Sequence, residues 1–288
     1  MHIPVLQKEV IEYLDIQPNE NFVDCTFGEG GHSAVMLENN GPNGKVLGIE
    51  ADEELIGNAK YGNRLILVND SYANLKKIVE KYNFQPIQGI LLDLGMSSWH
   101  LEKSGRGFSF QRDEPLDMRY SLQNRLTAET IVNFWSKTET ERILKEYGEE
   151  RFARQIVERI VEERKRKQIK TTFSLLEIIR EAVPGWYKRR KIHFATKTFQ
   201  ALRIAVNDEL NNLKYALPQA LEILDSGGKL LVISFHSLED KIVKEFFKNN
   251  SKEGKIKILT KKTVKPSFEE VKHNPRSRSA KLRAAQKI

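Results

Sequence analysis

The chain has 288 residues, 40% of them hydrophobic, which is enough for one large or two ordinary domains, and its formal net charge is +8. Its single cysteine excludes an internal disulfide and predicts a reducing, cytoplasmic compartment. Its charged first twelve residues exclude a signal peptide. No run of residues approaches the roughly 20 apolar residues of a membrane span. The six histidines follow no zinc-ligand spacing. The positive net charge is typical of proteins that bind a polyanion, with solubility alone as the alternative.

A glycine-rich turn over residues 24–33 is the first candidate site. The apolar spacing of residues 2–15 predicts a helix, which we expect to pack beside this turn. Glycine adopts positive φ, and the helix that begins after the turn exposes free N–H groups. The turn therefore suits a nucleotide-like cofactor, with a tight turn that binds nothing as the alternative. NAD fits poorly, because Ser33 stands where a dinucleotide fingerprint has its third glycine.

Three predicted parallel strands end on carboxylates. Residues 45–50 end on Glu50, where an acid can accept hydrogen bonds from ribose hydroxyls. Residues 88–95 are apolar until Asp93, as in a strand that is covered on both faces. Together with Asp24, these acids should meet at one edge of the sheet. Successive strand–helix units predict a doubly wound, mostly parallel α/β sheet.

Between the second and fourth strands, residues 52–61 predict a helix capped by Asp52, and residues 64–68 predict the third strand. Tyr72 follows that strand. Two interpretations of its ring are open: it stacks on an adenine, or it rests on the core.

Strand alternation stops after Gly95. Residues 104–120 mix Arg and Phe with Gly and Ser, which suits phosphate contact and base stacking, or a loop anchored by two phenylalanines. Residues 127–183 predict four helices, the third over 151–170 and the fourth over 173–183 with Thr172 as its cap. Residues 188–203 hold six Lys/Arg and no acid, which favours a polyanion over an ordinary solvated face.

Strand alternation returns at residues 229–235 and is followed by His236, which either faces the site or is satisfied locally. Residues 271–288 hold six Lys/Arg and no acid, and residues 281–288 predict a last strand. The expected organisation is a sheet domain in two parts, 1–103 and 204–288, with an inserted helical domain at 104–203.

Eight stretches, in their order along the chain, carry a resemblance to one family. They are residues 2–6 (HIPVL), 24–33 (DCTFGEGGHS), 91–95 (LLDLG), 106–110 (RGFSF) with 115–119 (PLDMR), 147–153 (YGEERFA), 198–203 (TFQALR) with 206–207 (VN), 233–240 (ISFHSLED) and 274–279 (NPRSRS). They resemble the bacterial MraW (RsmH) family, the ribosomal RNA small-subunit methyltransferase H enzymes, over nearly the whole chain.

The resemblance implies a class I methyltransferase fold with an inserted helical domain. It implies methyl transfer from S-adenosylmethionine to the N4 amine of one cytidine in the decoding region of 16S rRNA, within the small ribosomal subunit or its precursor. The positions that match the family's cofactor contacts are Gly30, Gly31, His32, Glu50, Tyr72, Asp93 and His100. The glycines and His32 would hold the methionine end and Glu50 the ribose, while Tyr72 and Asp93 would flank the adenine and amine side. His100 departs from the family's usual Gln.

No catalytic base is assigned. Many amino-methyltransferases carry a D/S/N-P-P-Y segment after the fourth strand, and residues 93–96 (DLGM) lack it. Asp93, Asp117 and His236 are candidates by location only. Two other functions stay open from the residues alone: a non-catalytic nucleic-acid-binding regulator that retains the nucleotide-binding fold, and a dehydrogenase, which the missing third glycine disfavours.

Overall fold

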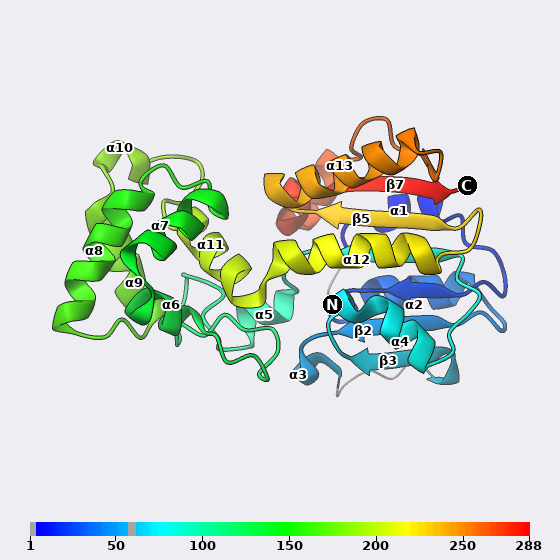
Figure 1. Ribbon diagram of the computed structural model, residues 1–288, viewed down its shortest axis with the longest axis horizontal. Coiled ribbons are helices and arrows are strands. Elements are labelled where there is room, and N and C mark those ends of the chain that lie inside the picture. The colour runs from blue at the N-terminus through cyan, green and yellow to red at the C-terminus, as the bar shows by residue number, and fades with distance from the viewer. Residues whose placement is uncertain (1–3, 57–61) are drawn as a thin grey trace. The chain divides into compact units, whose positions relative to one another are not determined.

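One sheet of seven strands organises the chain in the computed structural model, which describes residues 4–56 and 62–288 (Figure 1). The strands, in sheet order, are β3 Leu65–Asn69, β2 Val46–Glu50, β1 Phe22–Asp24, β4 Gly89–Asp93, β5 Lys229–Ser234, β7 Lys281–Lys287 and β6 Ile256–Ile258. The first five pair in parallel, and β7 runs antiparallel to both β5 and β6. This order confirms the predicted doubly wound, mostly parallel α/β sheet.

The chain divides into two compact units, Met1–Gly95 with Leu210–Ile288, and Met96–Glu209. The first unit contains the whole sheet. The predicted insertion, residues 104–203, lies inside the second unit, which extends beyond the prediction at both ends.

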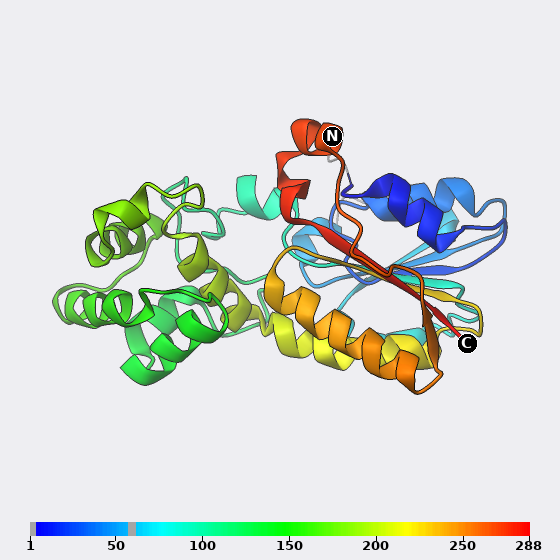
Figure 2. The same ribbon diagram turned by 90° about the horizontal axis from the view of Figure 1, so that it is seen from above.

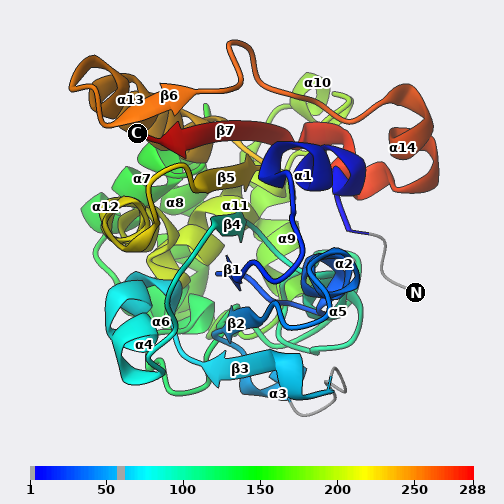
Figure 3. The same cartoon turned by 90° about the vertical axis from the view of Figure 1, so that its right-hand side faces the viewer.

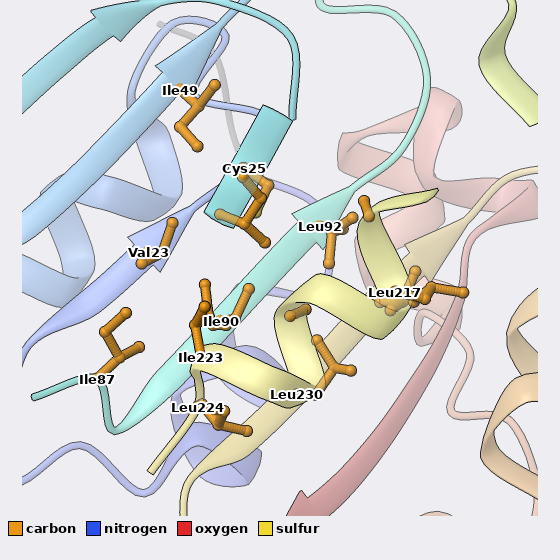
Figure 4. Close-up of a cluster of buried hydrophobic side chains, with 14 of the residues drawn as sticks. Val23, Cys25, Ile49, Ile87, Ile90, Leu92, Leu217, Ile223, Leu224 and Leu230 are labelled. Atoms are coloured by element: carbon orange, nitrogen blue, oxygen red, sulfur yellow. The ribbon is translucent and has the colours of Figure 1, made fainter. Parts of the chain in front are cut away.

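Helices cover both faces of the sheet in the first unit. One face carries α1 Gln7–Leu14 and α2 Gly31–Asn39; the other carries α4 Leu75–Lys81, α12 Glu209–Ile223 and α13 Ser237–Lys252 (Figures 2 and 3). Figure 4 shows the larger core cluster, where apolar strand residues such as Ile90 and Leu92 meet Leu217 of α12. Strands that are apolar on both faces are buried here because helices cover each face.

Strand register brings the three acids to one edge. Asp24 is paired with Gly48 on β2 and with Leu91 on β4. Glu50 and Asp93 therefore each lie two residues beyond the partners of Asp24, in the direction of the parallel strands. The predicted convergence of the strand-end carboxylates is confirmed.

Other predictions for this unit hold in part. The helix predicted over residues 52–61 is seen as α3 Glu53–Ile56, and Asp52 caps it, since its Oδ1 accepts a hydrogen bond from the backbone N–H of Glu54 at 3.1 Å. Residues 57–61 lie outside the described chain, as does His2. The predicted last strand is β7.

The second unit is helical. Its helices are α5 Ser98–Glu102, α6 Ala128–Phe134, α7 Lys137–Glu146, α8 Ala153–Arg166, α9 Thr172–Ala182, α10 Gly185–Lys188 and α11 Thr196–Asn207. Their apolar faces form a separate core.

Two predicted boundaries in this unit are wrong. The third predicted helix ends at Arg166, because the chain turns extended and buries Ile169, whose N–H donates to Asn133 Oδ1 at 2.9 Å.

The cap of α9 is also one residue from the prediction. Thr171 caps this helix, with its hydroxyl accepting from the N–H of Ser174 at 3.3 Å. Thr172 is instead buried, and its hydroxyl bonds the loop before α6: it donates to the carbonyl of Arg112 and accepts from the N–H of Glu114 at 3.1 Å.

The loop over residues 104–120 is anchored by aromatic side chains. Phe108 is buried in the helical core, and Phe110 packs edge-on against Phe199 with ring centroids 5.3 Å apart. Arg106 is buried too; its guanidinium donates to the carbonyls of Arg119 and Tyr120, both at 3.0 Å. The structure therefore favours the anchored-loop interpretation, because this arginine is used inside the protein.

Candidate cofactor site

Backbone geometry explains the three glycines of the turn. Gly28 and Gly30 have φ values of 56° and 80°, a region that non-glycine residues avoid. Gly31 opens α2, and a Cβ added there would lie 2.7 Å from Cγ of Pro4. The turn thus needs glycine twice for its conformation and once for close contact with the N-terminal segment.

Glu50 connects the end of β2 to this turn. Its Oε2 accepts a hydrogen bond from the N–H of Gly28 at 2.8 Å, and its Oε1 accepts from the N–H of Asp52 at 2.9 Å. The side chain is buried. A carboxylate oxygen accepts more than one hydrogen bond, so a ribose hydroxyl can still bind here. The backbone bonds hold the carboxylate still at the edge where the strands end.

Asp24 braces the turn from inside. Its Oδ2 accepts from the hydroxyl of Ser33 at 2.7 Å, and its Oδ1 accepts from the N–H of Thr26 at 3.2 Å. Burial raises the pKa of Asp24, and the neighbouring His32 and these hydrogen bonds act in the opposite direction. The hydroxyl of Thr26 in turn accepts from the N–H of Asp93 at 2.7 Å. The sequence motif of the turn includes Thr26 and Ser33, but only the structure shows which groups their hydroxyls bind.

His32 and Asp93 face each other at this edge. His32 Nε2 lies 3.4 Å from Asp93 Oδ2, and the imidazole is buried. Neither ring nitrogen, nor Oδ1 of Asp93, has a hydrogen-bond partner among the described residues. Burial lowers the pKa of His32, but the carboxylates of Asp93, Asp24 and Glu270 together outweigh it, so the pKa is raised.

Unpartnered buried polar atoms are rare in proteins and call for an explanation. Here three of them lie at or beside the start of α2, where a helix leaves its first N–H groups without intrahelical partners, and at the same end of the sheet as the carboxylate of Glu50. A ligand with charged groups at one end and a ribose further along would satisfy this set. The residues present therefore fit a nucleoside cofactor with an amino-acid end.

Tyr72 lies just past β3, in the short 3₁₀ helix Tyr72–Asn74, and it is half-buried against the core cluster. This contact accords with the second of the two interpretations, and it leaves the adenine contact a prediction. The hydroxyl of Ser71 caps the helix by accepting from the N–H of Ala73 at 3.2 Å.

His100 belongs to the second unit. It is buried in α5, where its ring lies edge-on to the rings of Trp99, Phe108 and Tyr120 at 4.9 to 5.5 Å. The hydroxyl of Ser97 lies 2.9 Å from its Nδ1. This is the setting of a core histidine, and the proposed cofactor contact stays a prediction.

Two of the three candidate bases are bound locally. Asp117 makes two bonds to the guanidinium of Arg119, at 2.7 and 2.8 Å. His236 caps α13 through its Nδ1; its Nε2 lies 3.1 Å from Glu239 Oε1 but forms no hydrogen bond with a described residue. Only Asp93 keeps a carboxylate oxygen without a partner among the described residues.

Comparison with known proteins identifies the family of this chain. The MraW methylase family matches residues 1–288. The chain belongs to the MraW methylase family. Ribosomal RNA small subunit methyltransferase H of Dictyoglomus thermophilum is 49% identical over all of this chain and 97% of its own length. The protein of the same name from Thermosipho melanesiensis is 48% identical, over all of this chain and 98% of its own.

Membership of the MraW methylase family makes the protein a methyltransferase, with S-adenosylmethionine as its methyl donor. A solved protein structure from Clostridium thermocellum aligns with this chain over the full length of both proteins. The TM-score is 0.50 at 16% sequence identity, which shows a shared fold. Among the described residues, the structure contains no helix that is both long and apolar enough to span a membrane.

Proposed function

We propose that this protein methylates the N4 amine of one cytidine in the decoding region of 16S rRNA. The main support for this proposal is the carboxylate of Asp93 at the end of β4. One of its oxygens has no hydrogen-bond partner among the described residues. Asp93 stands at the place where many amino-methyltransferases carry their D/S/N-P-P-Y segment, although residues 93–96 lack that motif. The names of the relatives, ribosomal RNA small subunit methyltransferase H, support the same substrate class.

Bound S-adenosylmethionine supplies an electrophilic methyl group on a sulfonium. Glu50 orients the ribose through its fixed carboxylate, and the backbone N–H groups of the turn bind the opposite end of the cofactor. The orientation is worth several orders of magnitude in rate, since it replaces a bimolecular encounter.

A cytosine amine is a weak nucleophile, because its lone pair is delocalised into the ring. Positive charge develops on this nitrogen as the carbon–nitrogen bond forms. In our proposal Asp93 accepts an N–H of the amine through Oδ1 and stabilises that charge. As the carbon–nitrogen bond forms, the bond between the methyl carbon and the donor's sulfur would break and leave a neutral thioether. The N4 proton would then pass to water, so a stronger base is unnecessary.

The second unit offers an RNA-binding surface. Residues 188–191 are four consecutive exposed cations, and Trp186 beside them is 47% exposed. The guanidinium of Arg151 lies 5.4 Å from the Trp186 ring, so cation and aromatic face are presented together. Single-stranded RNA is recognised by such combinations, with bases stacked on rings and phosphates on cations.

The test is methyl transfer from radiolabelled S-adenosylmethionine to small ribosomal subunits from cells that lack this enzyme, followed by digestion to nucleosides. We expect the label in N4-methylcytidine alone. Asp93→Asn should slow the transfer about 10²- to 10³-fold, the usual effect of losing one charge-stabilising group. Asp117→Asn, which removes a carboxylate held by Arg119, is the matched control for catalysis. Label in any other nucleoside, or an unimpaired Asp93 variant, would contradict the proposal.

A further inference from the structure

The segment that follows β6 carries an exposed aromatic ring among cations. Phe268 opens the short helix α14 Phe268–His273 and is 85% exposed, the highest value among large hydrophobic side chains of the described residues. We call the α14 patch the exposed residues Lys265, Phe268, Lys272, Arg276 and Arg278. Leaving an aromatic side chain in water forgoes the free energy that burial would provide, so its position needs a reason.

The patch is ordered rather than a loose tail. The hydroxyl of Ser267 caps α14 by accepting from the N–H of Glu270 at 3.1 Å. The N–H of Asn274 donates to the carbonyl of Glu270, and the hydroxyl of buried Ser277 donates to the carbonyl of Asn274 at 2.8 Å. Phe268 and Lys272, four residues apart on a helix, share one face. The ring and the ammonium group are therefore presented together.

The charge of the patch is unbalanced. Lys265, Lys272 and Arg278 form no ion pair with any described residue. Glu269 is the one exposed acid beside them. Glu270 faces inward instead, with its Oε1 accepting from the N–H of Leu6 at 2.8 Å.

The same helix is linked to the cofactor site through the N-terminal segment. The N–H of Leu6 donates to Glu270, and Pro4, two residues before Leu6, packs against Gly31 of the glycine turn. The charge of Glu270 also contributes to the raised pKa of His32. Figure 3 shows α14 beside the start of α1. The inner face of α14 thus supports the wall of the site, and its outer face carries the patch.

We propose that the α14 patch binds single-stranded rRNA next to the target nucleotide, with one base stacked on Phe268 and phosphates on the flanking cations. This inference rests on the proposed function, because it takes the substrate to be RNA. A base stacked on an exposed ring and a backbone on unpaired cations is the usual chemistry of single-strand binding. Purely electrostatic contact would not require the aromatic side chain.

The test measures RNA binding without methyl transfer. A fluorescein-labelled single-stranded RNA of decoding-region sequence is titrated with the full chain. Phe268→Ala should weaken binding about tenfold, as expected when one base no longer stacks, while Phe268→Trp retains it. Lys272→Ala with Arg278→Ala should lower the slope of log affinity against log salt by about 0.7 for each phosphate that the variant no longer binds. All variants should bind S-adenosylmethionine like the wild type.

Matched controls come from the same unit. Tyr215→Ala removes an aromatic side chain that is 62% exposed on α12, and Lys252→Ala with Lys257→Ala removes two exposed cations elsewhere. These should leave RNA binding unchanged. Wild-type RNA affinity in Phe268→Ala would overturn the proposal. So would weakened binding to whole subunits with unchanged binding to RNA, which would assign the patch to a protein partner. A patch that binds RNA in an enzyme that forms no N4-methylcytidine would refute the proposed function alone.

Discussion

Nε2 of His32 and Oδ2 of Asp93 lie 3.4 Å apart, joining the first turn of α2 to the end of β4 across the glycine turn. The two residues are 61 positions apart in the chain (93 − 32). Their buried, incompletely bonded atoms define the polar end of the candidate cofactor site. Substitutions in the turn, in the strand-end acids and in His32 probe the parts of that site separately.

Gly30→Ala should cost about 1–2 kcal/mol of stability, because φ is 80° at this residue. It should also weaken S-adenosylmethionine binding about tenfold, since the turn must relax and move its N–H groups. Gly227→Ala is the matched control, because φ is 81° there and an added Cβ would meet nothing within 4 Å. Gly227 precedes the amino end of β5, at the end of the sheet opposite the cofactor site. Thermal unfolding and calorimetric titration measure the two effects. Equal cofactor affinity in both variants would refute a binding role for the turn.

Glu50→Gln should weaken S-adenosylmethionine binding about 10- to 100-fold, the value of hydrogen bonds to a charged group. The amide retains the shape of the side chain but not its charge or both acceptors. Asp225→Asn serves as the control, because this half-buried carboxylate accepts from Gln88 Nε2 at 3.3 Å away from the turn. Calorimetry should show the loss in the first variant only; an unaffected Glu50 variant rules out the ribose contact.

The raised pKa of His32 predicts a pH dependence. A group whose folded pKa exceeds its unfolded value stabilises the fold below the unfolded pKa of about 6.5, and this contribution disappears as the pH rises through the folded pKa. The wild type should therefore exceed His32→Gln in stability more at about pH 6 than at about pH 9. Thermal unfolding across this range measures the difference.

For His193 we expect the opposite change of stability with pH. The ring is exposed overall but stacks on Phe110, and this partial desolvation together with the charge of Arg180 lowers the pKa of His193, so its neutral form is favoured in the folded protein. The stability of the wild type relative to His193→Gln should rise with pH. The same slope for both histidines would show that the His32 effect does not come from its carboxylate neighbours.

The cations at residues 188–191 should contact RNA. Changing Lys188, Arg189 and Lys191 to Ala should flatten the salt dependence of RNA binding by about 0.7 for each phosphate that is released from the protein. A control that changes Arg142, Lys145 and Arg154 removes the same charge, but these cations are each paired with a glutamate. Filter binding at several salt concentrations separates the two variants. If both variants lowered the slope of the salt dependence equally, the loss of net charge alone would explain the effect.

The strand-end acids could be predicted because parallel strands place successive carboxyl ends at one edge, whatever the loops between them do. The family resemblance supplied His32 and the glycines as site residues. Neither approach shows that Asp24 faces inward to Ser33, since burial depends on which side of the turn each side chain takes.

Errors fell where tertiary contacts override local pattern. Helix periodicity continues past Arg166, yet the burial of Ile169 ends the helix there. For the loop over residues 104–120 the sequence left RNA contact and an anchored loop both open, and the carbonyls that bind the guanidinium of Arg106 favour the second. A sequence pattern records the chemistry of a side chain but not its burial.

We propose that the site at the carboxyl ends of β1, β2 and β4, where Asp24, Glu50 and Asp93 lie, transfers a methyl group to one cytosine of 16S rRNA. Mapping of modified nucleotides in 16S rRNA, from cells with and without this protein, tests it most directly. We expect that N4-methylcytidine disappears at a single decoding-region position and returns when the wild-type chain, but not the Asp93→Asn variant, is restored. An unchanged modification profile would contradict it.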